Sequence, residues 1–385
     1  MTIVIEAASG KRNKLRQRLS ELNVPLVLLL TMIAGAGVLA LYSVSDGNWN
    51  PYAMPHGLRF SLAMLVMVGI GITPLKFWLS VAYPAYFGTF FLLLLVPVIG
   101  DTNMGAQRWL SLGGFQLQPS ELMKIALVLA LARYYHGLEF KQVSTITGLI
   151  IPLAMIGAPV GLVFLQPDLG TAILLGLSGA VVLLLAGISW RLVTLGVIAG
   201  VGGAIGGVQS GLIKAYQWER ITAFLNPDAD PLGANYHPNQ AKTAIGSGGI
   251  DGKGYMQGTQ TQLDFLPEMH TDFIFAILGE EFGLYGALVL LGLYLGVFFT
   301  TLQIAMSAKS HFGRLLSLGI AVTFVSYVLI NTGMVMGLAP VVGVPLPLVS
   351  YGGTVMLSMM AGFGLVMSTW IDRNQDTLRT TGFGG

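Results

Sequence analysis

The feature that most constrains this chain is a succession of long apolar runs separated by short polar segments. A membrane-spanning helix needs about 20 mostly apolar residues, because the hydrocarbon core of a bilayer is about 30 Å thick and each helical residue rises about 1.5 Å. Ten runs meet this requirement, at 24–44, 58–75, 77–99, 120–137, 146–165, 169–188, 191–212, 272–300, 315–337 and 351–371. The sequence therefore predicts an all-α, polytopic membrane protein built as a bundle of about ten transmembrane helices.

The composition favours the same fold class and excludes others. Hydrophobic residues occupy 54% of the 385 positions and charged residues only 10%, and the mean hydropathy of +0.72 is far above that of a soluble domain. The net charge of +2 is spread between the apolar runs, so no basic patch for nucleic acid is expected. The chain has no Cys, which excludes disulfides, thiolate catalysis and Cys-held zinc.

The distribution of Lys and Arg predicts the orientation in the membrane. Residues 1–22 form a basic tail with five Lys or Arg, residues 23–372 form the membrane domain, and residues 373–385 form a second tail. An even number of crossings places both tails on one side. Thirteen Lys and Arg residues then fall on that side, against two in the short loops opposite. Because short cytoplasmic loops are enriched in these residues, both termini are predicted to be cytoplasmic.

The polar connections gather on the other, external side. The longest, 213–271, is rich in Gly, Asn, Gln and Pro, so we expect it to lie on the bundle without a core of its own. The polar loop 101–119 and the turn 166–170 fall on the same side. The apolar segment 337–347 carries three prolines that exclude a regular helix, so it is predicted to re-enter the protein at membrane depth.

Asp272 is the first candidate for catalysis. It is the last polar residue before the eighth run, and Glu268, His270 and Thr271 lie within four positions of it. One interpretation is a helix cap, because Asp at a helix start accepts backbone N–H bonds and opposes the helix dipole. The other is a general base, because a partly desolvated carboxylate beside other ionisable groups can take a proton. The number of polar neighbours exceeds what a cap requires.

Three further charged residues carry two interpretations each. Glu121 and Lys124 lie three positions apart on one helix face, within about two turns of the external surface. Charges inside a span face the bundle interior or a wet cavity, so this pair is either a structural lock or part of a site. Asp168 is either the cap of the next helix or an acid that lines a cavity.

Cations on the external side are candidates for contact with an anionic group. Arg108 precedes Trp109, which belongs either to a site or to the interfacial aromatic belt. Arg220, Lys242 and Lys253 lie in the long loop. The Gly-Ser-Gly-Gly run soon after Lys242 is either a backbone cradle for phosphate or, more often, a hinge.

Glu280 and Glu281, two turns deeper in the eighth run than Asp272, are expected to be structural, neutral or paired with a cation from another segment. The five His residues do not cluster at ligand spacing, so any metal would be a hard cation such as Mg²⁺ or Mn²⁺, and no motif shows its site.

The signatures of several enzyme classes are missing from the sequence. It contains no P-loop, no HExxH and no G-x-S-x-G in a strand–turn–helix setting, so ATP hydrolysis, zinc proteolysis and lipase chemistry are unsupported. Acids and cations on one face of an apolar bundle suit a substrate with a polar anionic head outside and a hydrocarbon tail in the bilayer. The residues do not choose between moving such a substrate and reacting it.

Several motifs, in order, carry a resemblance to a known family. They are Gly105–Trp109, Gln118–Lys124, Gln166–Gly170, 244–249 with 252–254, 265–281, and Asn331–Gly353. With these segments the chain resembles the shape, elongation, division and sporulation family through nearly all of its membrane-embedded part. The stretch 258–263, GTQTQL, is closer to the elongation members than to the division members. The chain departs from the family at Tyr236–Asn239, where Pro238 is expected to interrupt helix.

The resemblance implies a peptidoglycan glycosyltransferase that polymerises lipid II on the outer side of the bacterial cytoplasmic (inner) membrane during cell elongation. The essential family aspartate falls on Asp272. Motif positions expected to line the cavity fall on Arg108, Trp109, Glu121, Lys124, Asp168, Arg220, Gln240, Lys242, His270 and Thr271. The implied partner is a class B penicillin-binding protein, the transpeptidase of the elongation machinery. A divalent cation, Mg or Mn, is associated with activity in the family.

As a hypothesis, Asp272 takes a proton from an acceptor sugar, whose oxygen displaces the diphosphate of the donor with inversion. A single base suffices for such a step. The alternatives are a lipid II flippase and a non-catalytic scaffold for the transpeptidase. A transporter alternates access around a midplane site, often between repeated halves. The sequence shows polar groups on one face and no apparent repeat, which favours the enzyme.

Overall fold

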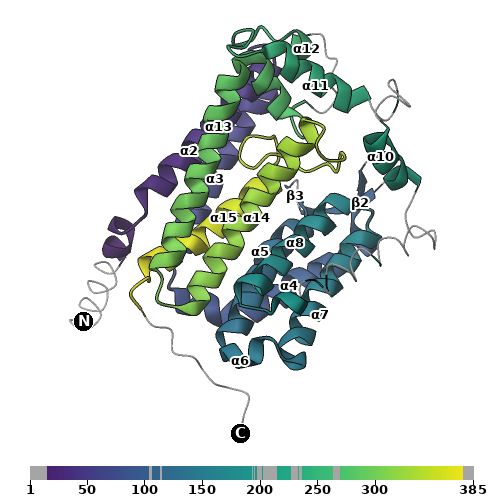
Figure 1. The fold of residues 1–385 in the computed structure, drawn as a ribbon. Coiled ribbons are helices and arrows are strands. Elements are labelled where there is room, and N and C mark those ends of the chain that lie inside the picture. The colour runs from purple at the N-terminus through teal and green to yellow at the C-terminus, as the bar shows by residue number, and fades with distance from the viewer. Residues whose placement is uncertain are drawn as a thin grey trace.

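The computed structural model describes residues 15–375, except 104–105, 113–114, 193, 195, 197–201, 203–214, 227–232, 234–235 and 263–268. Most of the described chain is helical, and the long helices run side by side as one bundle (Figure 1). In chain order the membrane helices are α2 (Val24–Val44), α3 (Met54–Gly71), α4 (Leu75–Ile99), α5 (Pro119–His136), α7 (Ile146–Leu165), α8 (Leu169–Leu185), α13 (Ile274–Ser307), α14 (His311–Val335) and α15 (Gly353–Ile371). The π-helix η1 (Trp49–Ala53) precedes α3, and the short α6 (Phe140–Val143) precedes α7.

Seven helices of the described residues are long and apolar enough to cross a membrane: α2, η1 with α3, α4, α7, α13, α14 and α15. The apolar α8 is shorter, and α5 has 18 residues but carries Glu121, Lys124 and Arg133. The expected run 191–212 lies mostly outside the described residues. The fold class predicted from the sequence, a helical multi-pass membrane protein, is confirmed.

The central helices differ from the outer ones in burial. Within the most apolar window of each helix, 83% of residues are buried in α15 and 72% in α14, against 22% in α3, α4 and α7. The last three therefore present much of their surface to lipid. The helix α5 is buried along most of its length, against α4, α8 and α14. This position explains how α5 can hold charged residues inside the bundle.

The expected polar loop 101–119 is a small antiparallel sheet. Its strands are β1 (Asp101–Asn103), β2 (Ala106–Leu112) and β3 (Phe115–Leu117), in the order β1-β2-β3. Pairing the strands satisfies backbone groups close to the membrane, where unpaired ones are costly. The strands β1 and β3 have three residues each, too few to show an alternating pattern, so the sheet was not predicted from the sequence.

The long loop contains α10 (Ala215–Leu225), α11 (Tyr236–Gly248) and α12 (Thr259–Gln262). Among the described residues of this loop, the buried Ala241 and Ala244 of α11 belong to the core of the bundle, and α11 packs on α13. The expectation that Pro238 interrupts a helix is wrong, because Pro238 lies in the first turn of α11. Backbone N–H groups in the first turn have no partner within the helix, so a proline there costs no hydrogen bond. The Gly-Ser-Gly-Gly run ends α11, with Gly249 at φ +59°. A Cβ on Gly248 would lie 2.1 Å from the Gly279 carbonyl oxygen, so this run is a packing contact.

The helix α13 is broken at Gly283, whose φ is +62°. Backbone N–H groups of the loop pair with the carbonyls around the break, at 3.0 Å from Lys253 N to Glu280 O and 3.0 Å from Gly254 N to Glu281 O. The Lys253 Nζ lies 2.6 Å from Glu280 Oε1. The interpretation of Lys253 as a partner for an external anion is therefore replaced by an ion pair with Glu280, and Glu280 is structural. The hydroxyl of Ser43 in α2 donates to Glu281 Oε1.

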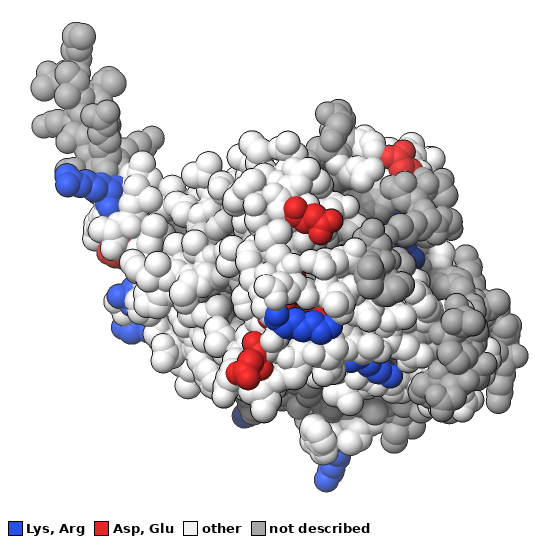
Figure 2. Space-filling model, turned by 90° about the horizontal axis from the view of Figure 1, so that it is seen from above, with Lys and Arg blue, Asp and Glu red and all other residues white. Residues whose placement is uncertain are grey.

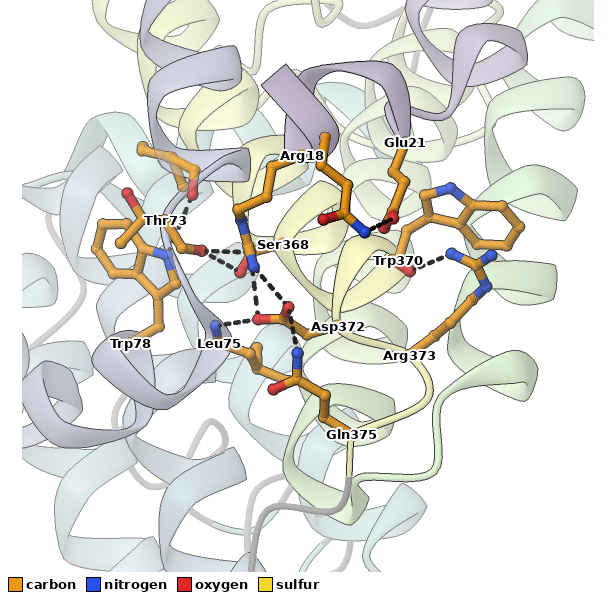
Figure 3. A network of polar contacts seen from close by, with 12 residues as sticks. Arg18, Glu21, Thr73, Leu75, Trp78, Ser368, Trp370, Asp372, Arg373 and Gln375 are labelled. Carbon is orange, nitrogen blue, oxygen red and sulfur yellow. Dashed lines mark hydrogen bonds and ion pairs between the residues drawn. The ribbon is translucent and has the colours of Figure 1, made fainter. Parts of the chain in front are cut away.

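At the opposite end of the bundle, a polar network ties the two ends of the membrane domain together (Figure 3). Arg18 pairs with Asp372 at 2.7 Å, and Asp372 Oδ2 accepts the N–H of Leu75 at 2.7 Å. Arg18 and Ser368 both donate to the carbonyl of Thr73, at 3.3 and 2.7 Å. The start of α2, the α3–α4 turn and the end of α15 therefore meet on one side, away from α10, α11 and α12 (Figure 1).

Candidate active site

A cavity of about 390 Å³ lies where the sheet, the long loop and the segment after α14 meet. Seven of the predicted site residues line it, namely Arg108, Trp109, Glu121, Asp168, Arg220, Thr271 and Asp272. They come from β2, α5, the turn before α8, α10 and the segment before α13. Seen from above, the face at this end is mostly uncharged, with a few scattered Lys, Arg, Asp and Glu (Figure 2). The fold therefore brings together polar groups that are far apart in the sequence.

Asp272 lies one residue before the N-cap of α13. The N-cap is Phe273, and no side chain makes a cap hydrogen bond there. The Asp272 carboxylate lines the cavity, and its Oδ2 would lie 3.4 Å from a Cβ on Gly343. Gly343 has φ +70°, a conformation that glycine adopts easily, so the backbone of the segment after α14 can approach the carboxylate. The Asp272 carboxylate thus lies at the wall of the cavity, where the general-base interpretation requires it.

The segment between α14 and α15 is irregular, as the prolines predicted. Its residues 346–350 are buried, whereas residues 336–343 are partly or fully exposed. Hydrogen bonds hold the segment against residues 270–272. Asn331 Nδ2 donates to Asp272 O at 2.8 Å and to Val344 O at 2.7 Å. Ser350 Oγ donates to Thr271 O at 2.5 Å, and Tyr351 N donates to His270 O at 2.8 Å. The backbone at Asp272 and the facing wall of the cavity are therefore fixed relative to each other.

Glu121 and Lys124 form a buried network with Tyr327 of α14. Lys124 Nζ lies 2.7 Å from Glu121 Oε1 and donates to the Tyr327 hydroxyl, which donates to Glu121 Oε2 at 2.6 Å. Glu121 is 3% exposed and Lys124 is 0% exposed. Glu121 and Tyr327 line the cavity, whereas Lys124 lies behind them. The pair thus locks α5 to α14 and also forms part of the cavity wall.

Asp168 is both a cap and a lining residue. Its Oδ1 accepts the N–H of Thr171 at 3.2 Å, which caps α8. Its Oδ2 accepts from Gln118 Nε2 at 3.2 Å and lies 3.8 Å from Arg108 Nε. The Arg108 guanidinium also donates to the carbonyl of Pro167. Arg108 is thereby held at the cavity with its charge only partly balanced by Asp168.

Besides Lys124, three predicted site residues do not line this cavity. The ring of His270 stacks on Tyr52 with centroids 4.4 Å apart. Lys242 lines a separate, smaller crevice together with Arg220. Gln240 lies half-buried on α11 and lines neither space. Glu268 lies outside the described residues.

Several residues that line the cavity were not predicted from the sequence. Tyr327 occupies an ordinary position in an apolar helix, and nothing in its neighbourhood distinguishes it. His237, Gly343 and Thr354 also line the cavity. Gln118 also lines the cavity and belongs to the Gln-Pro-Ser-Glu motif. Its polar side chain at the start of a membrane helix is the feature that could have identified it as a site residue.

The described residues do not form a cage for a metal ion. No group of three His, Asp or Glu lies at ligand spacing within the described part of the chain. In the cavity wall, Glu121 and Asp168 already pair with Lys124 and Arg108. Mg²⁺ is often held by one or two carboxylates with substrate phosphates supplying further ligands. The protein residues alone do not assign a site for it.

Comparison with known proteins identifies relatives along nearly the whole chain. The pattern of the cell cycle protein family of FtsW, RodA and SpoVE matches residues 20–375. Peptidoglycan glycosyltransferase MrdB of Escherichia coli K12 is 44% identical over 347 residues, which cover 90% of this chain and 93% of that protein. A probable peptidoglycan glycosyltransferase FtsW of Trichlorobacter lovleyi is 35% identical, covering 91% of this chain and 93% of the relative.

Solved structures show the same fold. One chain, from a peptidoglycan synthase complex that coordinates polymerization and crosslinking, has a TM-score of 0.81 and 31% identity, covering 92% of this chain and 99% of its own length. The crystal structure of the rod shape determining protein RodA of Thermus thermophilus has a TM-score of 0.70 and 28% identity. The match covers 92% of this chain and 98% of the RodA chain. From the matched residues and these relatives, the chain belongs to the cell cycle protein family of FtsW, RodA and SpoVE.

Proposed function

We propose that this protein is a peptidoglycan glycosyltransferase that polymerises lipid II on the outer side of the bacterial cytoplasmic membrane during cell elongation. The observation that carries the proposal is the cavity that holds Asp272 at one end of a membrane-embedded bundle. Its support from relatives is the 44% identity to peptidoglycan glycosyltransferase MrdB over 90% of the chain.

The cavity suits a lipid-linked sugar. Its volume of about 390 Å³ falls in the range of small-molecule sites. Arg108 and Arg220 supply positive charge at its wall for an anionic head group, and Trp109 and Tyr351 supply aromatic surface for sugar rings. The helix α8 contributes Thr171 and Leu174 to the cavity and exposes Ile173 and Leu177, so the hydrocarbon tail of the substrate can reach the bilayer along this helix.

The proposed reaction uses Asp272 as the general base. The Asp272 carboxylate takes the proton of the acceptor sugar hydroxyl, and the hydroxyl oxygen forms a bond to the anomeric carbon of the donor. The bond from that carbon to the diphosphate oxygen breaks, and its electron pair leaves with the diphosphate. The displacement inverts the anomeric centre, so no second nucleophilic carboxylate is required.

A base contributes typically 10²–10⁴-fold to such a rate. The remainder would come from positioning the two substrates and from positive charge near the departing diphosphate. The side chains of Asn331 and Ser350 donate to the backbone carbonyls of Asp272 and Thr271. These hydrogen bonds hold the Asp272 carboxylate in position for the reaction.

The proposed partner is a class B penicillin-binding protein, the transpeptidase that crosslinks the new strand. Its support is the fold shared with a chain of a complex named for coordinated polymerization and crosslinking. In the proposed orientation Asp272 faces the outer side of the membrane. Both termini then lie in the cytoplasm, because Arg18 and Asp372 lie at the opposite end of the bundle.

The test is glycan polymerisation by purified protein and Asp272→Asn, each with the transpeptidase partner and labelled lipid II. The substitution keeps the size of the side chain and removes the base, so we expect a rate loss of about 10²–10⁴-fold at normal membrane level. A wild-type protein that makes no glycan but moves lipid II across liposomes would replace the enzyme with a flippase. Normal cell elongation with Asp272→Asn would leave only the scaffold role.

A further inference from the structure

A second, smaller crevice adjoins the cavity that holds Asp272. Its volume is about 40 Å³, and α10, α11 and the end of α14 enclose it. Arg220 and Val341 line both spaces, so the crevice and the cavity share a wall. Arg220 Nη1 donates to Val341 O at 3.2 Å, which fixes the guanidinium at this shared wall.

The size of the crevice limits what it can hold. A buried water needs about 10–15 Å³ on this measure, so about 40 Å³ admits a few water-sized groups and no sugar ring. The larger cavity, at about 390 Å³, is the one with room for sugars. A compact anionic group is therefore the ligand that fits the crevice.

Two cations face this space. Arg220 reaches it from α10 and Lys242 from α11. Among the ion pairs of the described residues, none involves Lys242, and no hydrogen bond of its ammonium group is formed with the described chain. Lys and Arg together bind phosphate groups well, Lys as a compact charge and Arg through its fork of donors.

The position of Lys242 depends on Gly337. A Cβ on Gly337 would lie 1.9 Å from Lys242 Cε, and Gly337 has φ +73°. The aliphatic stem of Lys242 therefore crosses the bare backbone just beyond α14, and any larger residue there would displace it. The fold thus sets the Lys242 ammonium at one defined place beside the crevice.

Apolar residues border the same crevice and extend to the protein surface. Phe224, Met334 and Pro340 line it. The neighbours of Gly337 in sequence, Met336 and Leu338, are 42% and 73% exposed. An apolar chain attached to an anion in the crevice would therefore meet an apolar edge.

We propose that Arg220 and Lys242 bind one phosphate group of the donor's diphosphate in this crevice, while the sugars lie in the adjoining cavity, where Asp272 faces the acceptor hydroxyl. The inference rests on the proposed function and assigns the donor phosphate and the sugars to different spaces. When the bond from the anomeric carbon to the diphosphate oxygen breaks, the electron pair moves to that oxygen. Arg220 and Lys242 stabilise the added negative charge.

The test compares Lys242→Gln, Lys242→Arg and Gly337→Ala with wild type and with Lys76→Gln, which removes an exposed Lys elsewhere on the protein. Polymerisation of labelled lipid II with the transpeptidase present gives KM and kcat. A lost charge-assisted hydrogen bond is worth about 1.5–3 kcal/mol, so we expect Lys242→Gln to lower kcat/KM about 10- to 100-fold. Lys242→Arg should recover part of the loss. Gly337→Ala should resemble Lys242→Gln, because it displaces Lys242 while keeping its charge.

A second measurement separates binding from catalysis. Binding of a short polyprenyl diphosphate and of the matching monophosphate is measured on detergent-solubilised protein by thermophoresis, with size-exclusion profiles reporting folding. We expect the diphosphate to bind wild type and Asp272→Asn alike, and to bind Lys242→Gln about 10-fold or more weakly.

Wild-type kcat/KM and wild-type diphosphate binding in Lys242→Gln would overturn the inference while leaving the polymerase intact. Failure of the wild-type protein to polymerise would instead reject the proposed function.

Discussion

At the residue scale, several side chains have two roles where the sequence suggested a choice between them. Asp168 caps α8 and also lines the cavity, through its two carboxylate oxygens. Glu121 locks α5 to α14 and also faces the cavity. A carboxylate has two oxygens and about four acceptor positions, so one carboxylate can serve a helix end and a cavity together.

Asn331 is the residue that most directly holds Asp272 in place. Its side-chain nitrogen donates to two backbone carbonyls, Asp272 O and Val344 O. Ionised Asp cannot donate, so Asn331→Asp would leave both carbonyls unpaired and set a carboxylate against them. Each buried polar group left unpaired costs about 1–3 kcal/mol. We predict a fall in kcat of about 10-fold or more, with a lower melting temperature, measured by polymerisation and by fluorescence melting in detergent.

The matched control is Ser326→Ala on the same helix. In the described part of the chain the Ser326 hydroxyl donates to Val322 O, one turn earlier in α14, so its removal should leave both kcat and melting temperature close to wild type. Wild-type kcat in Asn331→Asp would contradict the positioning role, and a lower melting temperature alone would make Asn331 merely structural.

At the element scale, the attachment of the long loop to α13 depends on close backbone approach. Gly248 and Gly252 both lie against carbonyls of the broken part of α13, at 2.1 Å from a Gly248 Cβ to Gly279 O and 2.2 Å from a Gly252 Cβ to Glu281 O. The break at Gly283 frees carbonyls, and the loop backbone takes them up. At membrane depth a broken helix requires such partners, so the loop completes α13.

Two glycines of α11 test this packing. Gly248→Ala would place a Cβ against rigid backbone of α13, so we expect less folded protein in the membrane and a lower melting temperature. Gly246→Ala, two residues earlier, meets nothing within 4 Å and should be neutral or stabilising by about 0.5–1 kcal/mol, because Gly is a poor helix former. Membrane levels and detergent melting measure both. Equal stability of the two variants would refute the close contact between α11 and α13.

At the scale of the whole molecule, one buried carboxylate joins the first and last parts of the membrane domain. Asp372, 3% exposed at its side chain, accepts from Arg18, Leu75 and Gln375 (Figure 3). Arg18 precedes α2, Leu75 begins α4, and Asp372 follows α15. The contact therefore closes the bundle at the end opposite the cavity.

We predict that Asp372→Asn lowers the melting temperature and exposes the segment before α2 to protease. Breaking a charge-assisted contact costs about 1.5–3 kcal/mol, and the partial exposure of Arg18, 19% at its side chain, places the expected effect at the lower end. Glu21→Gln is the control, because within residues 15–375 the hydrogen bond of the Glu21 side chain is to the exposed Gln17. Since Asp372 is remote from the cavity, kcat at low temperature should not change. A matching loss of stability in Glu21→Gln would show that the Asp372 contact is not specific.

The sequence alone predicted the class of fold because lipid imposes one requirement on every span. Backbone groups must pair within the segment, and side chains must be apolar over about 20 residues, so each span leaves a local pattern. The irregular segment after α14 left a local pattern too, since prolines remove donors wherever they stand. The sheet left none, because the three-residue strands β1 and β3 are held by pairing with β2 and not by a pattern of their own.

The candidate site was predictable only as a set of residues on one side of the membrane. Which of them meet was decided by packing: Asp272 faces Gly343, Glu121 meets Tyr327, and Lys253 pairs with Glu280. Each partner lies on a different element, and the local sequence of a residue carries no record of the element packed against it. The sequence by itself predicted most of the spans, their order and the gathering of the candidate site residues at one end of the bundle. The tertiary structure decided that Lys242 faces a crevice of its own, because only the approach of α11 to the end of α14 forms that space.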